Sequence, residues 1–288
     1  YDITPSPDYV DLLPDHIIDP ENGNELVISQ SLIKKVREMA LDELCPKRLY
    51  HTEISKEVKE SDPENYANAR SMGSRFEYEL TGALTRAGLI PPEILTQSGA
   101  RGIPQQRISL NVNHAKRTLL RVGIFLNKAE AQKKLQFKCL EGNIDIYREK
   151  NNIVEIDDVK YSGLIGDFRH KFGWHPESIA HKFSHICQAS HYSLIGELAT
   201  GKPSRFRFIV FDNRANNQGE YQVFQINLSD SIRNQHKNLI LHVIKEIQNR
   251  FEGKGFEAVP SYEKCKECPM RAKCKDYQEF PEIVKVEV

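Results

Sequence analysis

No apolar run in this 288-residue chain approaches the length of about 18 residues that a membrane-spanning helix needs. The sequence also lacks a basic and then apolar leader, and it has no Gly-X4-Gly-Lys-Ser/Thr phosphate loop, so it predicts no helicase motor. Hydrophobic residues make up 39 % and charged residues 28 % of the chain, which excludes a compositionally disordered protein. We therefore expect a folded cytoplasmic protein with no membrane attachment.

Lysine and arginine are absent from residues 1–33, although the whole chain has 40 basic and 40 acidic residues. Seven acidic side chains lie in this segment: Asp2, Asp8, Asp11, Asp15, Asp19, Glu21 and Glu25. Four prolines precede residue 27 and indicate irregular structure. We expect residues 1–27 to form an acidic extended arm and residues 28–288 to form the main domain. Residues 115–138 carry seven basic side chains and one acidic side chain, which suits either a phosphate backbone or a solvated face.

Local patterns predict an α/β fold with a central mixed β-sheet flanked by helices. Apolar spacing and composition favour helices over five ranges: 31–49, 66–87, 115–135, 176–199 and 229–251. Pro46 lies within the first range, so we expect that helix to end or kink near Cys45. Alternating or β-branched segments favour strands over four ranges: 136–147, 153–161, 206–212 and 221–228. The first two strands, separated by a turn at 149–152, form a predicted hairpin.

This hairpin carries the charged residues that suggest catalysis. Asp145 lies on the first strand, and alternation places Asp158 and Lys160 on one face of the second strand. Buried carboxylates need compensation, and Mg²⁺ or Mn²⁺ is suited to their hard oxygen atoms. Asp157 or Glu155 can replace Asp158 on sequence grounds alone, but the spacing to the lysine favours Asp158.

Three further motifs surround the Asp158-X-Lys160 triplet in a fixed order. They are Gly73-X3-Glu77, Gly142-X2-Asp145 and Gln188-X3-Tyr192, the last with both side chains on one side of a predicted helix. Together the four motifs resemble the RecB-like branch of the PD-(D/E)XK nucleases. The resemblance covers about residues 28–278 and implies a restriction-endonuclease-like core in the main domain.

The resemblance also implies a role for each motif residue. Glu77, Asp145, Asp158 and the backbone carbonyl of Val159 would bind the divalent metal, with Glu79 as an alternative to Glu77. Lys160 would be the catalytic lysine. Gln188 and Tyr192 would position the DNA or the scissile phosphate.

Three of the six cysteines lie within ten residues near the C-terminus, as Cys265-X2-Cys268-X5-Cys274, and a fourth, Cys45, precedes the predicted sheet. This arrangement resembles the 4Fe–4S site of CRISPR-associated RecB-like exonucleases and of the nuclease half of AddB, and it implies a cluster that ties the two ends of the chain together. A four-cysteine zinc site uses the same ligands and is the alternative.

The resemblance predicts a DNA nuclease, most simply an exonuclease, acting in recombination, repair, CRISPR adaptation or defence. Its partners would be single-stranded DNA or duplex ends, together with a helicase or integrase. Two alternatives stay open on the sequence. One is a catalytically silent DNA-binding or assembly subunit of the same fold, and the other is a zinc-stabilised interaction protein.

Overall fold

The computed structural model describes residues 7–58, 76, 80, 105–121, 123–124, 129–162, 179–213, 220–266 and 268–277. The helix expected over 66–87 lies outside these residues except for Phe76 and Leu80, which are both helical. In the described part of the chain, no helix is both long enough and apolar enough to cross a membrane.

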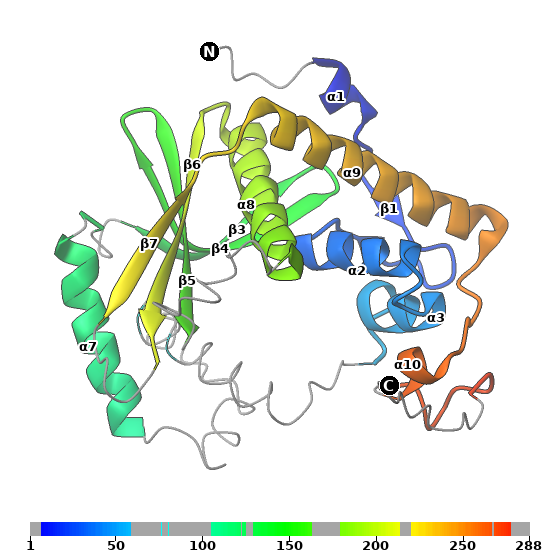
Figure 1. The fold of residues 1–288 in the computed structure, drawn as a ribbon. Coiled ribbons are helices and arrows are strands. Elements are labelled where there is room, and N and C mark those ends of the chain that lie inside the picture. The colour runs from blue at the N-terminus through cyan, green and yellow to red at the C-terminus, as the bar shows by residue number, and fades with distance from the viewer. Residues whose placement is uncertain are drawn as a thin grey trace, which may run out of the picture.

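A five-stranded mixed sheet forms the centre of the molecule, as the sequence predicts (Figure 1). Its strands, in the order in which they pair, are β3 (Glu130–Phe137), β4 (Leu140–Lys150), β5 (Ile153–Ser162), β6 (Ser204–Asp212) and β7 (Tyr221–Ile226). β5 and β6 run parallel, and the other neighbours are antiparallel. Asn151 and Asn152 form the turn between β4 and β5 with φ of 52° and 60°, the geometry of a tight hairpin. The predicted hairpin is therefore confirmed.

Two helices cover opposite faces of the sheet, α7 (Gln105–Arg121) on one side and α8 (Ile179–Thr200) on the other (Figure 1). Side chains alternate along β5, so its residues enter two separate cores. Val154 and Ile156 belong to the core on the α8 side, and Val159 and Tyr161 belong to the core on the α7 side. Asp158 and Lys160 continue the row that faces α8.

The α8-side core is the larger one and includes helices from both ends of the chain. These are α2 (Gln30–Ala40) and α9 (Asp230–Asn249), the latter followed by the π-helical turn η4 (Arg250–Lys254). α2 begins at an N-cap, Ser29, whose side chain accepts a hydrogen bond from the backbone of Leu32.

The N-terminal segment also joins this core, so the expectation of an extended arm is wrong. It contains α1 (Pro7–Leu12) and a two-stranded sheet of β1 (Ile17–Ile18) and β2 (Glu25–Leu26). Its apolar side chains are buried among the core residues: Tyr9, Leu13, Ile17 and Leu26. One of its acids, Asp19, is buried too and accepts a hydrogen bond of 3.0 Å from the Tyr50 hydroxyl. The prolines and acidic side chains of this segment favour irregular structure locally, but contacts of its apolar side chains with distant parts of the chain decide the outcome.

Two of the predicted helices have different boundaries in the structure. The helix expected over 115–135 ends at Arg121, and residues 130–135 belong to β3 instead. Lysine, glutamine and alanine in this segment favour helix locally, but pairing with β4 overrides that preference, and lysines are well tolerated on an edge strand. The first helix, expected to end or kink near Cys45, ends at Ala40 and is followed by Asp42 with φ of 62°.

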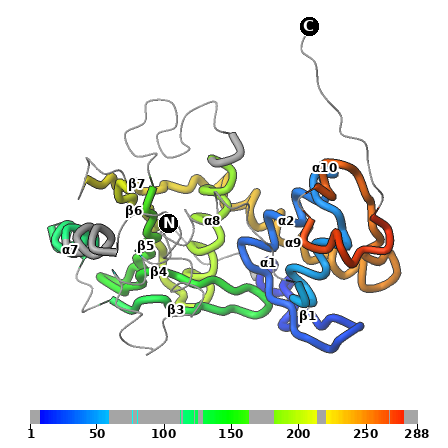
Figure 2. Tube along the Cα trace, turned by 90° about the horizontal axis from the view of Figure 1, so that it is seen from below, coloured from blue at the N-terminus to red at the C-terminus, as the bar shows by residue number. Residues whose placement is uncertain are grey.

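The segment that follows α2 lies beside the C-terminal part of the described chain, as both views show (Figure 1 and Figure 2). The short helices α3 (Pro46–Leu49) and α10 (Tyr262–Cys265) lie together there, with η1 (Tyr50–Ile54) next to them. Two ion pairs join the segments: Lys264 Nζ lies 2.5 Å from Asp42 Oδ1, and Lys47 Nζ lies 2.7 Å from Asp276 Oδ2.

Candidate active site and cysteine site

Strands β4 and β5 separate where the candidate carboxylates lie. Their ladder runs from Lys150 opposite Ile153 to Ile146 opposite Asp157, and it ends one position before Asp145. Asp145 Oδ2 instead accepts a hydrogen bond of 2.8 Å from the backbone N–H of Val159. A carboxylate thus replaces the backbone pairing, and this brings Asp145 next to the end of β5 that carries Asp158 and Lys160.

Asp158 is the most enclosed member of the group, with 2 % of its surface exposed. Its Oδ1 accepts a hydrogen bond of 2.6 Å from Gln188 Nε2 on α8, and its Oδ2 lies 2.6 Å from Lys160 Nζ. Burial raises the pKa of Asp158, although the Lys160 ammonium and the Gln188 amide both oppose that rise. The Lys160 side chain is 35 % exposed, so its ammonium can meet a molecule that approaches from solvent.

Tyr192 packs on the glycine of the Gly142-X2-Asp145 motif. A Cβ atom on Gly142 would lie 3.1 Å from both Cδ1 and Cε1 of the Tyr192 ring. Burial raises the pKa of Tyr192, and the nearby carboxylates of Asp158 and Asp145 raise it further, so the phenol stays neutral. The glycine motif of β4 and the Gln-X3-Tyr motif of α8 therefore meet at one place.

The structure brings together six of the predicted site residues: Asp145, Asp158, Val159, Lys160, Gln188 and Tyr192. Glu77 and Glu79 lie outside the described residues. Phe76, which is described, stacks on the Tyr161 ring with a centroid separation of 4.3 Å.

Among the described side chains, no group of three or more His, Cys, Asp or Glu is arranged to hold a metal ion. Asp145 and Asp158 nevertheless carry carboxylate oxygens, the kind of ligand that Mg²⁺ and Mn²⁺ prefer. The raised pKa of Asp158 means that its buried charge is incompletely compensated, and a divalent cation would supply that compensation. The donor set therefore fits a hard metal ion.

The alternative carboxylates lie elsewhere. Asp157 and Glu155 point to the opposite face of β5, where both are paired with arginines. Arg207 on β6 binds Asp157 through two hydrogen bonds of 2.6 and 3.0 Å. The sequence analysis missed these arginines, because the pairing of Asp157 with Arg207 depends on the parallel register between β5 and β6.

The four predicted cysteine ligands line one small cavity between α3 and α10: Cys45, Cys265, Cys268 and Cys274. Burial raises the pKa of Cys268, and Cys265 and Cys45 are close enough to raise it further. Lys47, Arg48 and Arg271 line the same cavity and can balance the charge of thiolates. The donor set fits a soft metal, but a cavity of about 20 Å³ holds only about one water-sized sphere. The thiols must therefore rearrange to enclose a four-iron cluster.

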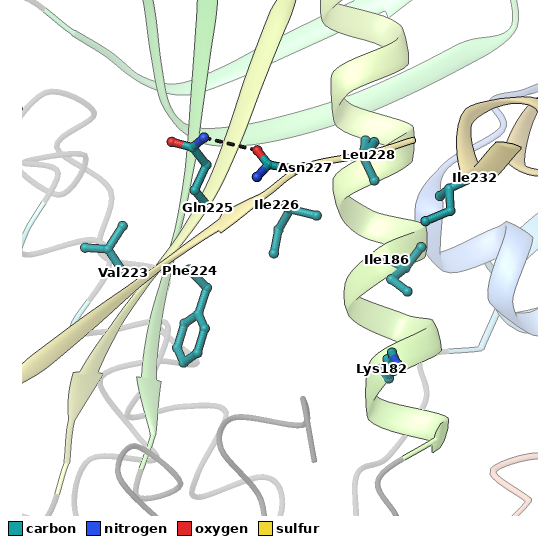
Figure 3. Close-up of a pocket in the computed structure, with 9 residues that line it drawn as sticks. All are labelled: Lys182, Ile186, Val223, Phe224, Gln225, Ile226, Asn227, Leu228 and Ile232. Carbon is teal, nitrogen blue, oxygen red and sulfur yellow. Dashed lines mark hydrogen bonds between the residues drawn. The ribbon is translucent and has the colours of Figure 1, made fainter. Parts of the chain in front are cut away.

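A larger groove of about 510 Å³ lies between β7 and α8 (Figure 3). Apolar side chains such as Ile186, Phe224 and Ile226 line it, with Lys182 at one end. None of the candidate catalytic residues lines this groove, so it gives no information on the reaction.

A scan against protein-family models finds no match, and a search of curated proteins finds no relative. Among solved structures, a candidate exonuclease from Eubacterium rectale shares 13 % sequence identity with this chain. The superposition covers 88 % of this chain and 91 % of that one, with a TM-score of 0.57. The two proteins therefore share a fold.

Two other matches have lower scores. An alkaline exonuclease from Laribacter hongkongensis is 16 % identical over 65 % of this chain and 94 % of its own, with a TM-score of 0.35. A phage-related exonuclease from Haemophilus somnus is 12 % identical over 80 % of this chain and 97 % of its own, with a TM-score of 0.38. With TM-scores below 0.5, these two matches carry no conclusion about this chain.

Proposed function

We propose that this chain is a metal-dependent DNA nuclease with a restriction-endonuclease-like core, which hydrolyses phosphodiester bonds as an exonuclease. The observation that carries the proposal is the setting of Asp158, a buried carboxylate beside Asp145 that is held by Lys160 and Gln188. The fold shared with the candidate exonuclease from Eubacterium rectale supports it. A buried, incompletely compensated carboxylate at the end of a strand is typical of a catalytic site.

Asp145 and Asp158 would hold Mg²⁺ or Mn²⁺, with Glu77 and the carbonyl of Val159 completing the site by the resemblance given above. When bound, the metal supplies an activated water and stabilises negative charge on the phosphate. The Asp145 carboxylate is fixed by the Val159 N–H, so one of its oxygens is already oriented before any metal arrives.

The other side chains orient groups and hold charge. Lys160 is partly exposed, and its ammonium can contact the attacking water or a phosphate oxygen. Gln188 fixes the orientation of Asp158 from α8. Tyr192, neutral because of its raised pKa, has a hydroxyl that can donate a hydrogen bond to the phosphate.

The cysteine site has a separate, structural role in this proposal. Cys45, Cys265, Cys268 and Cys274 would hold a 4Fe–4S cluster that ties α3 to α10. The small cavity favours a single zinc ion as the alternative, because one ion requires less movement of the thiols. Iron, acid-labile sulfide and zinc content of anaerobically purified protein decides between them. Iron and sulfide in equal amounts support the cluster, and zinc alone contradicts it.

The test of the nuclease is a time course on end-labelled single-stranded and duplex DNA with Mg²⁺ or Mn²⁺. We expect Lys160→Ala to reduce the cleavage rate by about 10²–10³, the effect of removing one charge-stabilising group. The control is Lys150→Ala, which changes an exposed lysine at the far end of β4. If folded, metal-loaded wild-type protein cuts neither substrate, the catalytic proposal fails and a silent DNA-binding subunit takes its place.

A further inference from the structure

Lys34 on α2 is half-buried, and no acidic side chain of the described residues pairs with it. Its Nζ donates one hydrogen bond of 3.0 Å, to Ser184 Oγ on α8. An ammonium has three donors, so two remain for another ligand. The next residue, Lys35, is also enclosed but forms an ion pair of 2.8 Å with Glu53, as buried lysines usually do. Among the described residues, Lys35 thus has a carboxylate that compensates its charge, and Lys34 has only a serine hydroxyl.

Arg37 stands one turn further along α2 and faces the same part of α8. Its guanidinium carbon lies 4.2 Å from the centre of the Phe183 ring, so the aromatic face holds the cation in place. No carboxylate of the described residues pairs with Arg37. A guanidinium that stacks on a ring keeps its N–H groups at the edge of that plane for phosphate oxygens.

Lys34 and Arg37 both lie close to residues 183–187 of α8. Burial raises the pKa of the Cys187 thiol to about 12, and the positive charges of Lys34 and Arg37 both oppose that rise. Cys187 precedes Gln188, the residue that donates to Asp158. Figure 1 and Figure 2 both show α2 beside α8, so this arrangement follows from the packing of the two helices.

The spacing along α8 connects this positive site to the candidate catalytic site. Ser184 and Gln188 are four residues apart, so they share one side of the helix with a rise of about 6 Å between them. One of these residues contacts Lys34, and the other contacts Asp158. Phosphates on one strand follow each other at about 3.4 Å along a nucleic acid axis, so about 6 Å spans about two nucleotides.

We propose that Lys34 and Arg37 bind the phosphate backbone of the DNA strand being cut, about two nucleotides from the scissile bond. The inference rests on the proposed nuclease function and adds a binding site on α2 to it. α2 then has two functions: its apolar side packs into the core, and Lys34 and Arg37 guide the substrate across the N-terminal half of α8.

The experiment measures binding of a single-stranded oligonucleotide to the full chain by fluorescence anisotropy across a series of salt concentrations. A Lys160→Ala background keeps the DNA intact, and Lys34→Ala, Arg37→Ala and Lys35→Ala are each introduced into it. Each lost phosphate contact reduces the slope of log K against log salt by about 0.7. We expect this reduction, with about tenfold weaker binding, for Lys34→Ala and for Arg37→Ala. Lys35→Ala, the matched control, should keep the slope of the background.

A conservative variant separates charge from packing. Lys34→Arg keeps the cation and should retain most of the salt slope, whereas a merely structural role predicts the same loss for both changes. If the wild-type protein cuts DNA but Lys34→Ala and Arg37→Ala bind like Lys35→Ala, the inference is overturned and the nuclease proposal stands. If the wild-type protein neither binds nor cuts DNA, both are overturned.

Discussion

Asp157 and Asp158 are neighbours on β5, are almost completely buried, and have opposite surroundings. Asp157, with 0 % exposure, meets Arg207 through two hydrogen bonds and Arg148 through a third of 3.0 Å. Asp158, with 2 % exposure, meets one lysine and one amide. Burial raises the pKa of both carboxyl groups, but only Asp157 has two guanidinium groups to oppose the rise.

The contrast shows that the two faces of β5 carry buried carboxylates in different roles. On the α7 side each carboxylate is paired with two arginines, and Arg148 also donates to the backbone carbonyl of Gly123, which anchors the end of α7. On the α8 side the charge is left partly uncompensated, beside a lysine that reaches solvent. A carboxylate whose charge is fully paired serves the fold, whereas a carboxylate whose charge is only partly compensated can bind a cation.

Substituting Asp157 is expected to have the largest effect on stability. Asp157→Asn removes the charge that Arg207 and Arg148 share and leaves both guanidinium groups buried without it, at a cost of about 3–5 kcal/mol. Urea unfolding followed by circular dichroism measures this loss. A loss below about 1 kcal/mol would contradict the structural role of the network.

Substituting Asp158 should have a small effect on stability and a large effect on cleavage. Asp158→Asn leaves the partly exposed Lys160 in contact with solvent, so the free energy of unfolding should change by less than about 1 kcal/mol. Cleavage, if the proposed function holds, should fall by about 10²–10³. Rates and urea midpoints of the two asparagine variants, measured side by side, provide the comparison. Equal losses of stability would mean that both carboxylates are structural.

The α8 side also contains a buried pair of neutral imidazoles. His191 on α8 and His236 on α9 lie with ring centroids 5.6 Å apart, and burial lowers their pKa values to about 4 and about 3. The unfolded chain binds these protons near pH 6.5, so stability is complete above that pH and is lost as the pH falls toward 4. Each histidine contributes about 3 kcal/mol to this loss, at 1.36 kcal/mol per pKa unit.

His236→Leu tests that pH dependence, because His236 Nε2 has no hydrogen-bond partner among the described residues. We expect the variant to lose about 3 kcal/mol less stability than the wild type between pH 6.5 and pH 4, as measured by urea unfolding at each pH. His242→Leu, on an exposed position of the same helix, is the control and should follow the wild-type curve. Identical curves of stability against pH for all three proteins would show that His236 does not contribute to the pH dependence.

Local patterns were sufficient for the elements that carry the candidate site. The hairpin of β4 and β5, the two following strands and α8 all occur close to their predicted positions, because their periodicity and turn residues agree with their tertiary environment. Residues 130–135 and the N-terminal segment were predicted wrongly for the opposite reason. There the sequence favours helix or irregular structure, and distant contacts decide the outcome.

The site itself could be predicted only in part. The order of the motifs identified Asp145, Asp158, Lys160, Gln188 and Tyr192, which the structure places together. The ion pairing of Asp157 could not be foreseen, because its partner lies 50 residues away on a parallel strand. Lys34 could not be foreseen either, since its contact with Ser184 spans 150 residues.

The smallest expected effect concerns how α8 rests on β4. A Cβ on Gly142 would lie 3.1 Å from the Tyr192 ring, so Gly142→Ala must push that ring by a few tenths of an ångström. Overpacking of this kind costs about 1 kcal/mol or more. Gly196→Ala provides a matched control on α8, because its Cβ would lie 3.1 Å from Ile156 Cδ1 and would not touch Tyr192.

Both alanine variants should therefore lose a similar amount of stability in urea. Only Gly142→Ala should also lower the cleavage rate, by about tenfold, because only it displaces the hydroxyl that we propose contacts the phosphate. Equal cleavage rates for the two variants, at equal loss of stability, would show that Tyr192 packs α8 against the sheet and does not position the substrate. Of the two α8 residues in the candidate site, only Gln188 would then remain in a catalytic role.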